Sequence, residues 1–393
     1  MTQPSRTQGD PLEHTLLHRL LVQTDQLQTL PLLAIVFFLL LNIIVVTLIW
    51  WLNTADLTAT LLVTAGYTLA NTVDWVGLRS LRTTGRSYGP DKPSILALSA
   101  LRLFILIILG FLAAPSWLVL SLLAAISLLV YYATWVEPFR LGVTQQTYQT
   151  AKWPADAPPL RLLQIGDIHM EAITPREVEL NRLIDELKPD IIVFTGDFVN
   201  LSNTHNADTE TAIREIISQW QAPLGVYCVT GTPLVEPLAR VEAFTTGLDN
   251  LKLLPNQWIT VKTPGGPLNI LGLIVTHDMQ RDRELLKRMM SIAPKTGLHL
   301  LLMHPPDIAP EANDLGIDLY LCGHTHGGQI RFPIIGAVFS ISHLGNQFIM
   351  GRYELGTTTL YTSRGVGMEG LGAPRARFLC PPEIILWEIT GTG

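Results

Sequence analysis

The chain has 393 residues, of which 48% are hydrophobic and only 15% are charged. Soluble domains carry about 25% charged residues, so part of this chain is expected to avoid water. The formal net charge of −6 gives no reason to expect nucleic acid as a partner, because nucleic-acid binding favours clustered Lys and Arg. Three cysteines stand far apart, which argues against a disulfide framework and predicts reduced, buried thiols: Cys228, Cys322 and Cys380.

The amino-terminal third is predicted to enter a membrane. Residues 1–29 form a mostly polar segment, and residues 30–136 are predicted to be a membrane region with about four transmembrane helices. The first, 30–52, contains no charge and exceeds the roughly 20 residues that span the hydrocarbon core. The polar segment before it argues against a cleaved signal peptide.

Three further candidate spans follow, at 57–77, 94–114 and 116–136. Asp74 lies near the end of the first of these, and Arg102 lies inside the second. An unpaired arginine at mid-membrane costs about 2.5–3.5 kcal/mol. Two alternatives are open: the two residues pair between helices, or each lies near a membrane interface.

Basic residues concentrate between the second and third spans: Arg79, Arg82, Arg86 and Lys92. Cytoplasmic loops are enriched in such residues. The chain is therefore predicted to be an integral protein of the plasma membrane, with its amino terminus and everything after residue 136 in the cytoplasm. Residues 137–159 are expected to be a linker that holds at most one early strand.

Residues 160–393 alternate apolar runs with amphipathic stretches. LRLLQIGDIHM and DIIVFTGDFVN are typical of buried strands, and between them TPREVELNRLIDEL predicts a helix. Thr174 and Glu177 have the spacing of a capping box at its start. Continuous apolar strands separated by helices predict an α/β domain whose sheets are covered on both faces.

Residue types that ligate metals follow several of these apolar runs. They are Asp167 and His169 in GDIH, Asp197 in TGDF, His304 in MHPP, and His324 and His326 in GHTHGGQ. The carboxyl ends of strands form the ligand-binding edge in proteins of this class. An extended X-x-X spacing points both members of each pair the same way. The other histidines, His277 among them, lack such settings and are expected to be structural or solvated.

These motifs resemble, in order, the signature of the calcineurin-like metallophosphoesterases: GDxH, GDx, GNH followed by an acid, a His, and GHxH. The resemblance covers about residues 160–390, and four of its five blocks are present. TSRGVGMEG and PRARFLCPPEI are also similar to the small, often membrane-tethered, bacterial members. The resemblance implies an α/β fold, a four-layer αββα sandwich with two mixed sheets between helices.

The same resemblance implies two divalent metal ions, Mn, Fe or Zn, as cofactors. One metal would take Asp167, His169, Asp197 and His326, and the other would take Asp197, His304 and His324. Asp197 would then bridge the two ions. Paired metals bind a phosphoryl oxygen and generate hydroxide near neutral pH, which would attack phosphorus in line with the leaving oxygen.

One block departs from the family pattern, in the stretch GVYCVTGTPLVEP. Thr232 and Pro233 stand where the family has Asn as a metal ligand and His as a proton donor. Three protein ligands plus water remain a normal catalytic arrangement, but a general acid contributes about 10²–10⁴-fold. Glu236, His277 and Arg364 are the candidates to replace that His. The alternative for each of them is a purely structural role.

The predicted catalytic residues are therefore Asp197, His304, His324 and Arg364. The leading interpretation is a membrane-anchored phosphoesterase acting on a phosphodiester or phosphomonoester, with a lipid- or nucleotide-linked substrate favoured because tethering brings the site near lipid. The alternative is a regulatory domain that binds metal or phosphate with little turnover. A transporter-like protein with a structural metal domain is a third interpretation, disfavoured by the weakly polar spans.

Overall fold

The structure is a computed structural model that describes residues 16–204, 206–338 and 340–392. The chain divides into two compact units. The helical unit holds Leu16–Glu137 together with Gly370–Ala376, and the sandwich unit holds Pro138–Glu369 and the residues from Arg377 onward. All three cysteines are unpaired and buried, as predicted.

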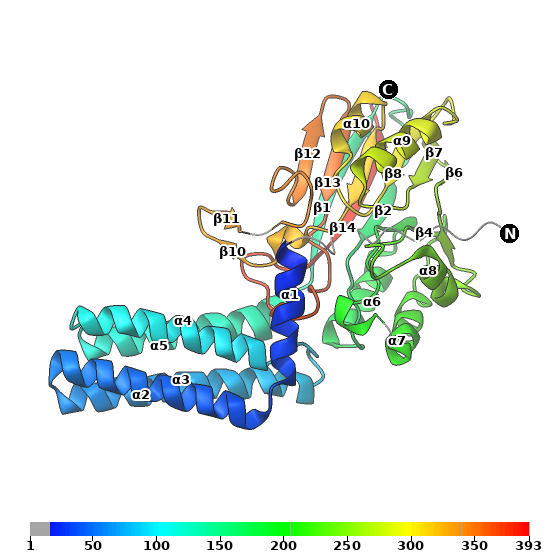
Figure 1. The fold of residues 1–393 in the computed structure, drawn as a ribbon. Coiled ribbons are helices and arrows are strands. Elements are labelled where there is room, and N and C mark those ends of the chain that lie inside the picture. Colours follow the sequence, from blue (N-terminus) through cyan, green and yellow to red (C-terminus); the bar gives the residue numbers. More distant parts are fainter. Residues whose placement is uncertain (1–15, 205, 339, 393) are drawn as a thin grey trace. The chain divides into compact units, whose positions relative to one another are not determined.

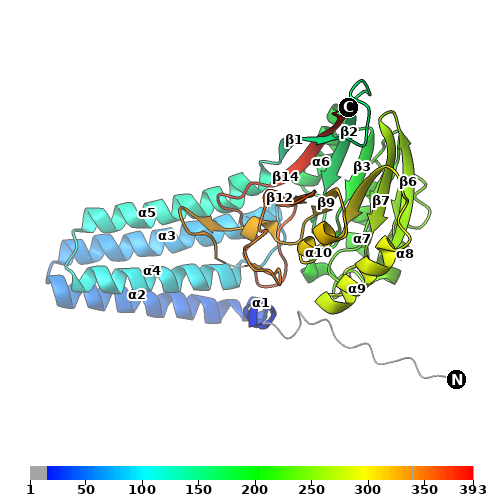
Figure 2. The same cartoon turned by 90° about the horizontal axis from the view of Figure 1, so that it is seen from above.

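The helical unit is built from α1 (Leu16–Gln26), α2 (Leu32–Thr54), α3 (Leu57–Thr83), α4 (Lys92–Phe111) and α5 (Ser116–Tyr131). A π-helical turn and a 3-10 turn extend α5 to Phe139. Within this unit α2 packs against α3 and α4, and α3 packs against α5 (Figure 2). The helix α1 lies in the range 1–29 that the sequence predicts only as a polar segment.

The bundle α2–α5 carries polar groups inside and apolar groups outside. Arg102 is wholly buried, and its guanidinium lies 2.5 Å from the Asp74 carboxylate. Asn42 donates to the buried Ser99 hydroxyl at 3.0 Å. Of the two alternatives for Asp74 and Arg102, pairing between helices is the one that the structure contains. A bundle that pairs its buried charges and exposes apolar side chains suits a lipid surrounding.

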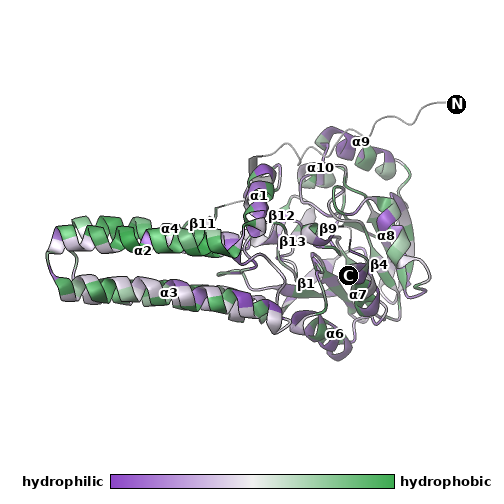
Figure 3. Cartoon of the chain, turned by 60° about the horizontal axis from the view of Figure 1, so that its bottom comes forward, coloured by the Kyte–Doolittle hydropathy of each residue, from purple (hydrophilic) through white to green (hydrophobic). Residues whose placement is uncertain are grey.

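Three helical segments among the described residues are long and apolar enough to cross a membrane: Leu32–Thr54, Lys92–Phe111 and Ser116–Phe139. Figure 3 shows α2 and α4 coloured mainly as apolar, whereas α3 is mixed. The sequence predicts about four spans, and α3 is the weaker one because some of its buried positions, among them Asn71 and Asp74, are polar.

The sandwich unit contains two six-stranded sheets (Figure 1). The first has the order β1 (Gly142–Thr150), β14 (Glu383–Gly391), β2 (Leu160–Ile165), β3 (Ile191–Phe194), β4 (Val226–Cys228), β5 (Leu251–Leu253). The second has the order β12 (Gly351–Leu355), β13 (Thr358–Thr362), β9 (Leu319–Cys322), β8 (Leu298–Leu302), β7 (Gly266–Gly272), β6 (Gln257–Thr263). Both sheets are mixed, because each contains parallel and antiparallel pairs.

Three apolar cores separate four layers. In β3, Ile191 and Val193 point into the core between the sheets, whereas Ile192 and Phe194 point toward the outer helices. Those helices are α6 (Pro175–Leu187), α7 (Ala207–Ile217) and α8 (Leu238–Thr245), and α9 (Met279–Met290) and α10 (Ala309–Asp314) cover the second sheet. The predicted α/β fold and four-layer αββα sandwich are therefore confirmed. The capping box of Thr174 and Glu177 opens α6.

The sandwich unit takes in residues before 160, where the sequence prediction starts the metallophosphoesterase-like domain. The strand β1 lies in the range 137–159, where the sequence predicts a linker with at most one early strand, and it pairs in parallel with β14 along its whole length. Its alternation of polar residues with Tyr148 and Thr150 is too weak to assign the strand to the sheet. The sandwich unit therefore begins within three residues of the last helical turn, which ends at Phe139.

Candidate metal centre

The six predicted ligands gather at the carboxyl ends of four strands. Asp167 and His169 follow β2, Asp197 follows β3, His304 follows β8, and His324 and His326 follow β9. Two of these strands belong to each sheet, so the site lies where the edges of both sheets meet. All six side chains are buried.

Five of the six ligands adopt left-handed backbone conformations. Their φ angles are 52° at Asp167, 41° at His169, 61° at Asp197, 73° at His324 and 52° at His326. The reason given from sequence for their convergence, an extended alternation, is therefore wrong. Non-glycine residues in this region carry a cost of about 1–3 kcal/mol each, and such strain concentrates at functional sites.

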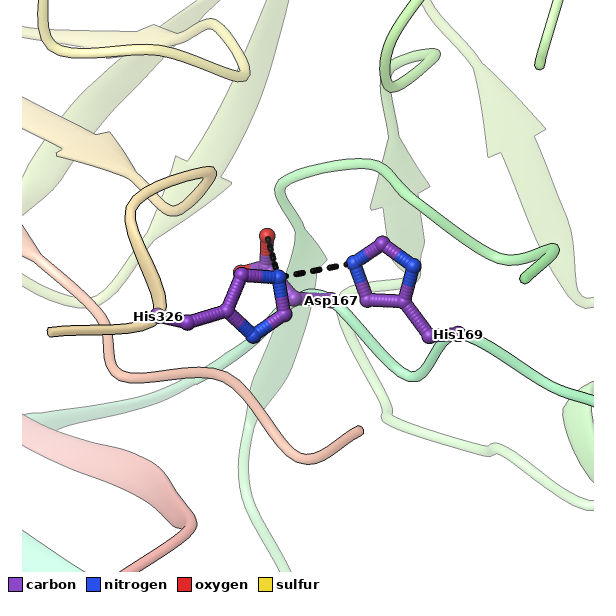
Figure 4. A group of neighbouring side chains, drawn as sticks. All are labelled: Asp167, His169 and His326. Atoms are coloured by element: carbon purple, nitrogen blue, oxygen red, sulfur yellow. Dashed lines mark hydrogen bonds and ion pairs between the residues drawn. The ribbon is translucent and has the colours of Figure 1, made fainter. Parts of the chain in front are cut away.

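The first cluster consists of Asp167, His169 and His326, whose ligand atoms lie within 4.8 Å of one another (Figure 4). The Nε2 atoms of His326 and His169 are 2.8 Å apart, and His326 Nε2 is 3.9 Å from Asp167 Oδ1. Residues His324 and His326 thus diverge into different clusters although only one residue separates them.

The second cluster consists of Asp197, His304 and His324, again within 4.8 Å. Asp197 Oδ2 lies 3.0 Å from His304 Nε2 and 3.3 Å from His169 Nε2. One carboxylate oxygen therefore stands between the two clusters, in the position that a bridging ligand requires.

The residues fit two metal ions. Four buried polar atoms of the clusters have no hydrogen-bond partner: Asp167 Oδ2, His169 Nδ1, His324 Nε2 and His326 Nδ1. An unsatisfied buried polar atom costs about 1–3 kcal/mol, and a divalent cation would satisfy oxygen and imidazole donors together. The mixed set of histidine and carboxylate suits Mn, Fe or Zn.

Burial and neighbouring charges tune these groups toward ligation. Burial, together with nearby cationic groups, holds the pKa values of His324 and His326 well below the usual value, so both imidazoles are neutral at pH 7. Burial raises the pKa of Asp197, but His304 and His169 outweigh it and hold that pKa well below its usual value. Burial raises the pKa of Asp167 to about 6. Burial lowers the pKa of His304, but Asp197 outweighs it and raises that pKa to about 9.

The altered third block lies against the second cluster. The Thr232 amide donates to Asp197 Oδ1 at 2.7 Å, and its hydroxyl lies 3.4 Å from Asp197 Oδ2. Gly231 comes so close to Asp197 that an added Cβ would collide with the carboxylate and its backbone. The strand end therefore still directs residue 232 at the second cluster, while Pro233 begins a turn.

The three candidates to replace the missing donor differ in their surroundings. Glu236 accepts hydrogen bonds from the Val199 and Gly231 amides, a role in holding the loop. Arg364 forms an ion pair with Glu383 at 2.5 Å, which directs its guanidinium toward that carboxylate. His277 is buried, with its ring 5.5 Å from that of His324.

Arg377 is a buried residue that sequence reasoning does not single out. Its guanidinium donates to backbone carbonyls of the loop 364–367 and of Cys380, at 2.5 to 3.2 Å. Gly367 in that loop donates its amide to the Asp167 carbonyl. Burial lowers the pKa of Arg377 to about 10. It is a positioning residue for the first cluster, and its only sequence signal is its place in the closing PRARF block.

Comparison with known proteins agrees with this geometry. Residues 160–328 match the family model of the calcineurin-like phosphoesterases. Residues 160–328 of the sandwich unit are a calcineurin-like phosphoesterase domain. The match contains all six predicted ligands, which lie between residues 167 and 326.

Three bacterial relatives match most of their own length. The metallophosphoesterase YkuE of Bacillus subtilis is 29% identical over 66% of this chain and 90% of its own. The phosphodiesterase YaeI of Escherichia coli is 26% identical over 62% and 86%. The UDP-2,3-diacylglucosamine pyrophosphatase LpxG of Chlamydia trachomatis is 28% identical over 68% and 94%. Named relatives of this domain thus include a phosphodiesterase and a pyrophosphatase.

Proposed function

We propose that this chain is a membrane-anchored, metal-dependent phosphoesterase that hydrolyses a phosphodiester or phosphomonoester. The observation that carries the proposal is the placement of Asp197 Oδ2 between His304 and His169, 3.0 Å and 3.3 Å from their Nε2 atoms. Two divalent cations bound there would polarise a phosphoryl oxygen and lower the pKa of a bound water.

The protein's own side chains supply position and charge. Asp197, His304 and His324 hold the second cluster, and His304 is fixed in turn because its Nδ1 lies 2.9 Å from the Thr195 carbonyl oxygen. Such an outer contact sets the ring orientation and the tautomer that leaves Nε2 to ligate. Asp167 accepts the His324 amide at 2.7 Å and so ties the two clusters together.

As a substitute for the missing proton donor, His277 is better placed than Arg364. Its ring faces that of His324 at the second cluster, whereas the Arg364 side chain pairs with Glu383. We therefore expect His277→Gln to slow hydrolysis of a poor leaving group more than Arg364→Gln does. The predicted catalytic role of Arg364 becomes the weaker part of the proposal.

A lipid- or nucleotide-linked substrate is favoured within this proposal. The relative LpxG is named as a pyrophosphatase of UDP-2,3-diacylglucosamine. Three helical segments of this chain are long and apolar enough to cross a membrane. An enzyme anchored in this way meets substrates that share the bilayer.

Contacts within the helical unit support a cytoplasmic location for the metal centre. Arg86 lies over the Trp135 ring at 5.6 Å, and Lys92 donates to the carbonyl oxygens of Gln28 and Leu30. The basic loop, the start of α2 and the end of α5 therefore share one end of the bundle. Since basic loops face the cytoplasm, the chain that follows α5 would begin on that side.

The second candidate is a regulatory domain that binds metal or phosphate with little turnover, and Thr232 and Pro233 favour it. Turnover of a generic aryl phosphodiester with added Mn²⁺ separates the two. We expect hydrolysis by the purified full chain and none by Asp197→Asn. Metal binding without hydrolysis, on good and poor leaving groups alike, would support the regulatory candidate instead.

A further inference from the structure

The hairpin formed by β10 (Arg331–Phe332) and β11 (Gly336–Ala337) presents an apolar tip. Ile334 is fully exposed, Ile335 is 74% exposed, Phe332 is 49% exposed and Val338 is 51% exposed. Large apolar side chains clustered on a protruding turn are characteristic of interaction sites. None of these four side chains belongs to the three apolar cores of the sandwich unit.

The turn at the tip is built from residues that strain it. Ile334 adopts a left-handed conformation with φ 70°, although β-branched residues rarely do so. Tight hairpin turns favour Asn, Asp or Gly at such positions. A strained and exposed isoleucine gains nothing within the fold. Contact of its side chain with a surface outside the fold would account for its presence.

The base of the hairpin is fixed to the metal centre. The ligand His326 opens the short helical turn His326–Gly328, only a few residues before β10. The Arg331 guanidinium donates to the Gly327 carbonyl at 2.8 Å, and the Arg331 amide donates to the Phe378 carbonyl. Whatever the tip binds is therefore held beside the phosphoesterase site.

The chain itself indicates what covers the tip. The last apolar helical segment ends at Phe139 and β1 begins at Gly142. Three residues reach at most about 11 Å, so the sandwich unit starts at the membrane surface if those helices span it. Residues 329–338 include Arg331 and contain no Asp or Glu, a composition that suits an anionic lipid surface.

We propose that the hairpin 331–338 inserts its tip into the acyl region of the bilayer and places the metal centre on lipid-linked phosphate esters. This inference rests on the membrane anchoring of the proposed function and names the surface that the substrate comes from. It predicts that the tip contacts lipid whether or not turnover is observed.

The test is depth-dependent quenching on the full chain in lipid vesicles. Ile335→Cys is labelled with a fluorophore, and the native cysteines are buried and stay unlabelled. Ile292→Cys is the matched control, since Ile292 is also an isoleucine of the sandwich unit and is 68% exposed. Quenchers on the acyl chains should remove most of the fluorescence at 335 and little at 292, whereas aqueous iodide should do the reverse.

Iodide quenching at 335 equal to that at 292 would overturn the proposal. Protection at 335 from both quenchers would also overturn it, because a protein surface, such as a second copy of this chain, would then cover the tip. Release of the whole chain from vesicles at alkaline pH would contradict the anchoring itself. Lipid quenching at 335 without any turnover would leave the hairpin proposal standing and contradict only the activity.

A second variant tests the consequence for substrates. Ile334→Asn with Ile335→Ser puts Asn at the left-handed position and a polar residue beside it, so the variant should fold. Hydrolysis of a soluble aryl phosphodiester should stay unchanged. Hydrolysis of a bilayer-embedded phosphodiester should fall by about tenfold or more, because two isoleucine side chains no longer enter the acyl region. Equal rates on the embedded substrate would contradict the role of the tip.

Discussion

The two clusters share the Asp197 carboxylate and differ in what surrounds it. The first, Asp167, His169 and His326, keeps every residue of its motifs, and the loop that Arg377 holds packs against it. The second has Thr232 at the position where the resemblance leads one to expect Asn, and Thr232 contacts Asp197 through its own amide. Because a backbone amide makes that contact, the loop keeps its place although the side chain has changed.

The largest expected effect comes from removing the shared ligand. Asp197→Ala should remove most of both metals, because the two clusters then keep only imidazoles and one carboxylate between them. Metal content per chain, measured by elemental analysis, checks this. The exposed Asp185→Ala is the control and should keep both metals. Unchanged metal content in Asp197→Ala would remove the basis for a shared site.

The next largest effect should be loss of metal from one cluster at a time. His326→Ala should empty the first cluster and leave metal at the second, and His324→Ala should do the opposite, because each imidazole belongs to one cluster only. Isothermal titration calorimetry of each variant with metal checks both expectations. If either substitution emptied both clusters equally, the division between them would be wrong.

The pH dependence of metal affinity should also differ. Metal at the first cluster competes with a proton on Asp167, whose pKa burial raises to about 6. Affinity there should fall about tenfold per unit as pH drops below 6 and level off above it. At the second cluster the pKa of His304, raised to about 9 by Asp197 against burial, makes affinity keep rising between pH 6 and 8. Mn²⁺ titrations of the His324→Ala and His326→Ala variants at several pH values resolve the two curves.

The smallest expected effect comes from changing the two residues that depart from the family pattern in the third block. Thr232→Asn should tighten the second cluster, because residue 232 already faces Asp197. Adding Pro233→His should then raise turnover of a poor leaving group at least about tenfold, with little gain on an aryl leaving group that needs no proton. Loss of turnover on both substrates would mean instead that the loop is adapted to a specific substrate.

The gathering of the six predicted ligands could be foreseen because these Asp and His residues stand directly after apolar runs. Their conformations could not be predicted, since the left-handed backbone at residues such as Asp167 and His324 is imposed by close contacts from distant segments. Gly323, for example, must lack a Cβ because Asp167 packs against it. The strand β1 could not be assigned to the sheet because its pairing partner, β14, is more than 200 residues away.

The buried arginines show a similar limit. Pairing of Arg102 with Asp74 is one of the two alternatives open from sequence, because both are charges in apolar helices. Arg377 could not be matched, because its partners are carbonyl oxygens that no side-chain pattern marks.

The bridge itself is tested most directly by electron paramagnetic resonance of the chain loaded with Mn²⁺. Two ions joined through the Asp197 carboxylate should give the spectrum of an exchange-coupled pair, and Asp197→Asn should abolish that coupling. The signal of isolated Mn²⁺ ions at full loading, the same in the parent chain and in Asp197→Asn, would contradict a two-metal centre at these residues.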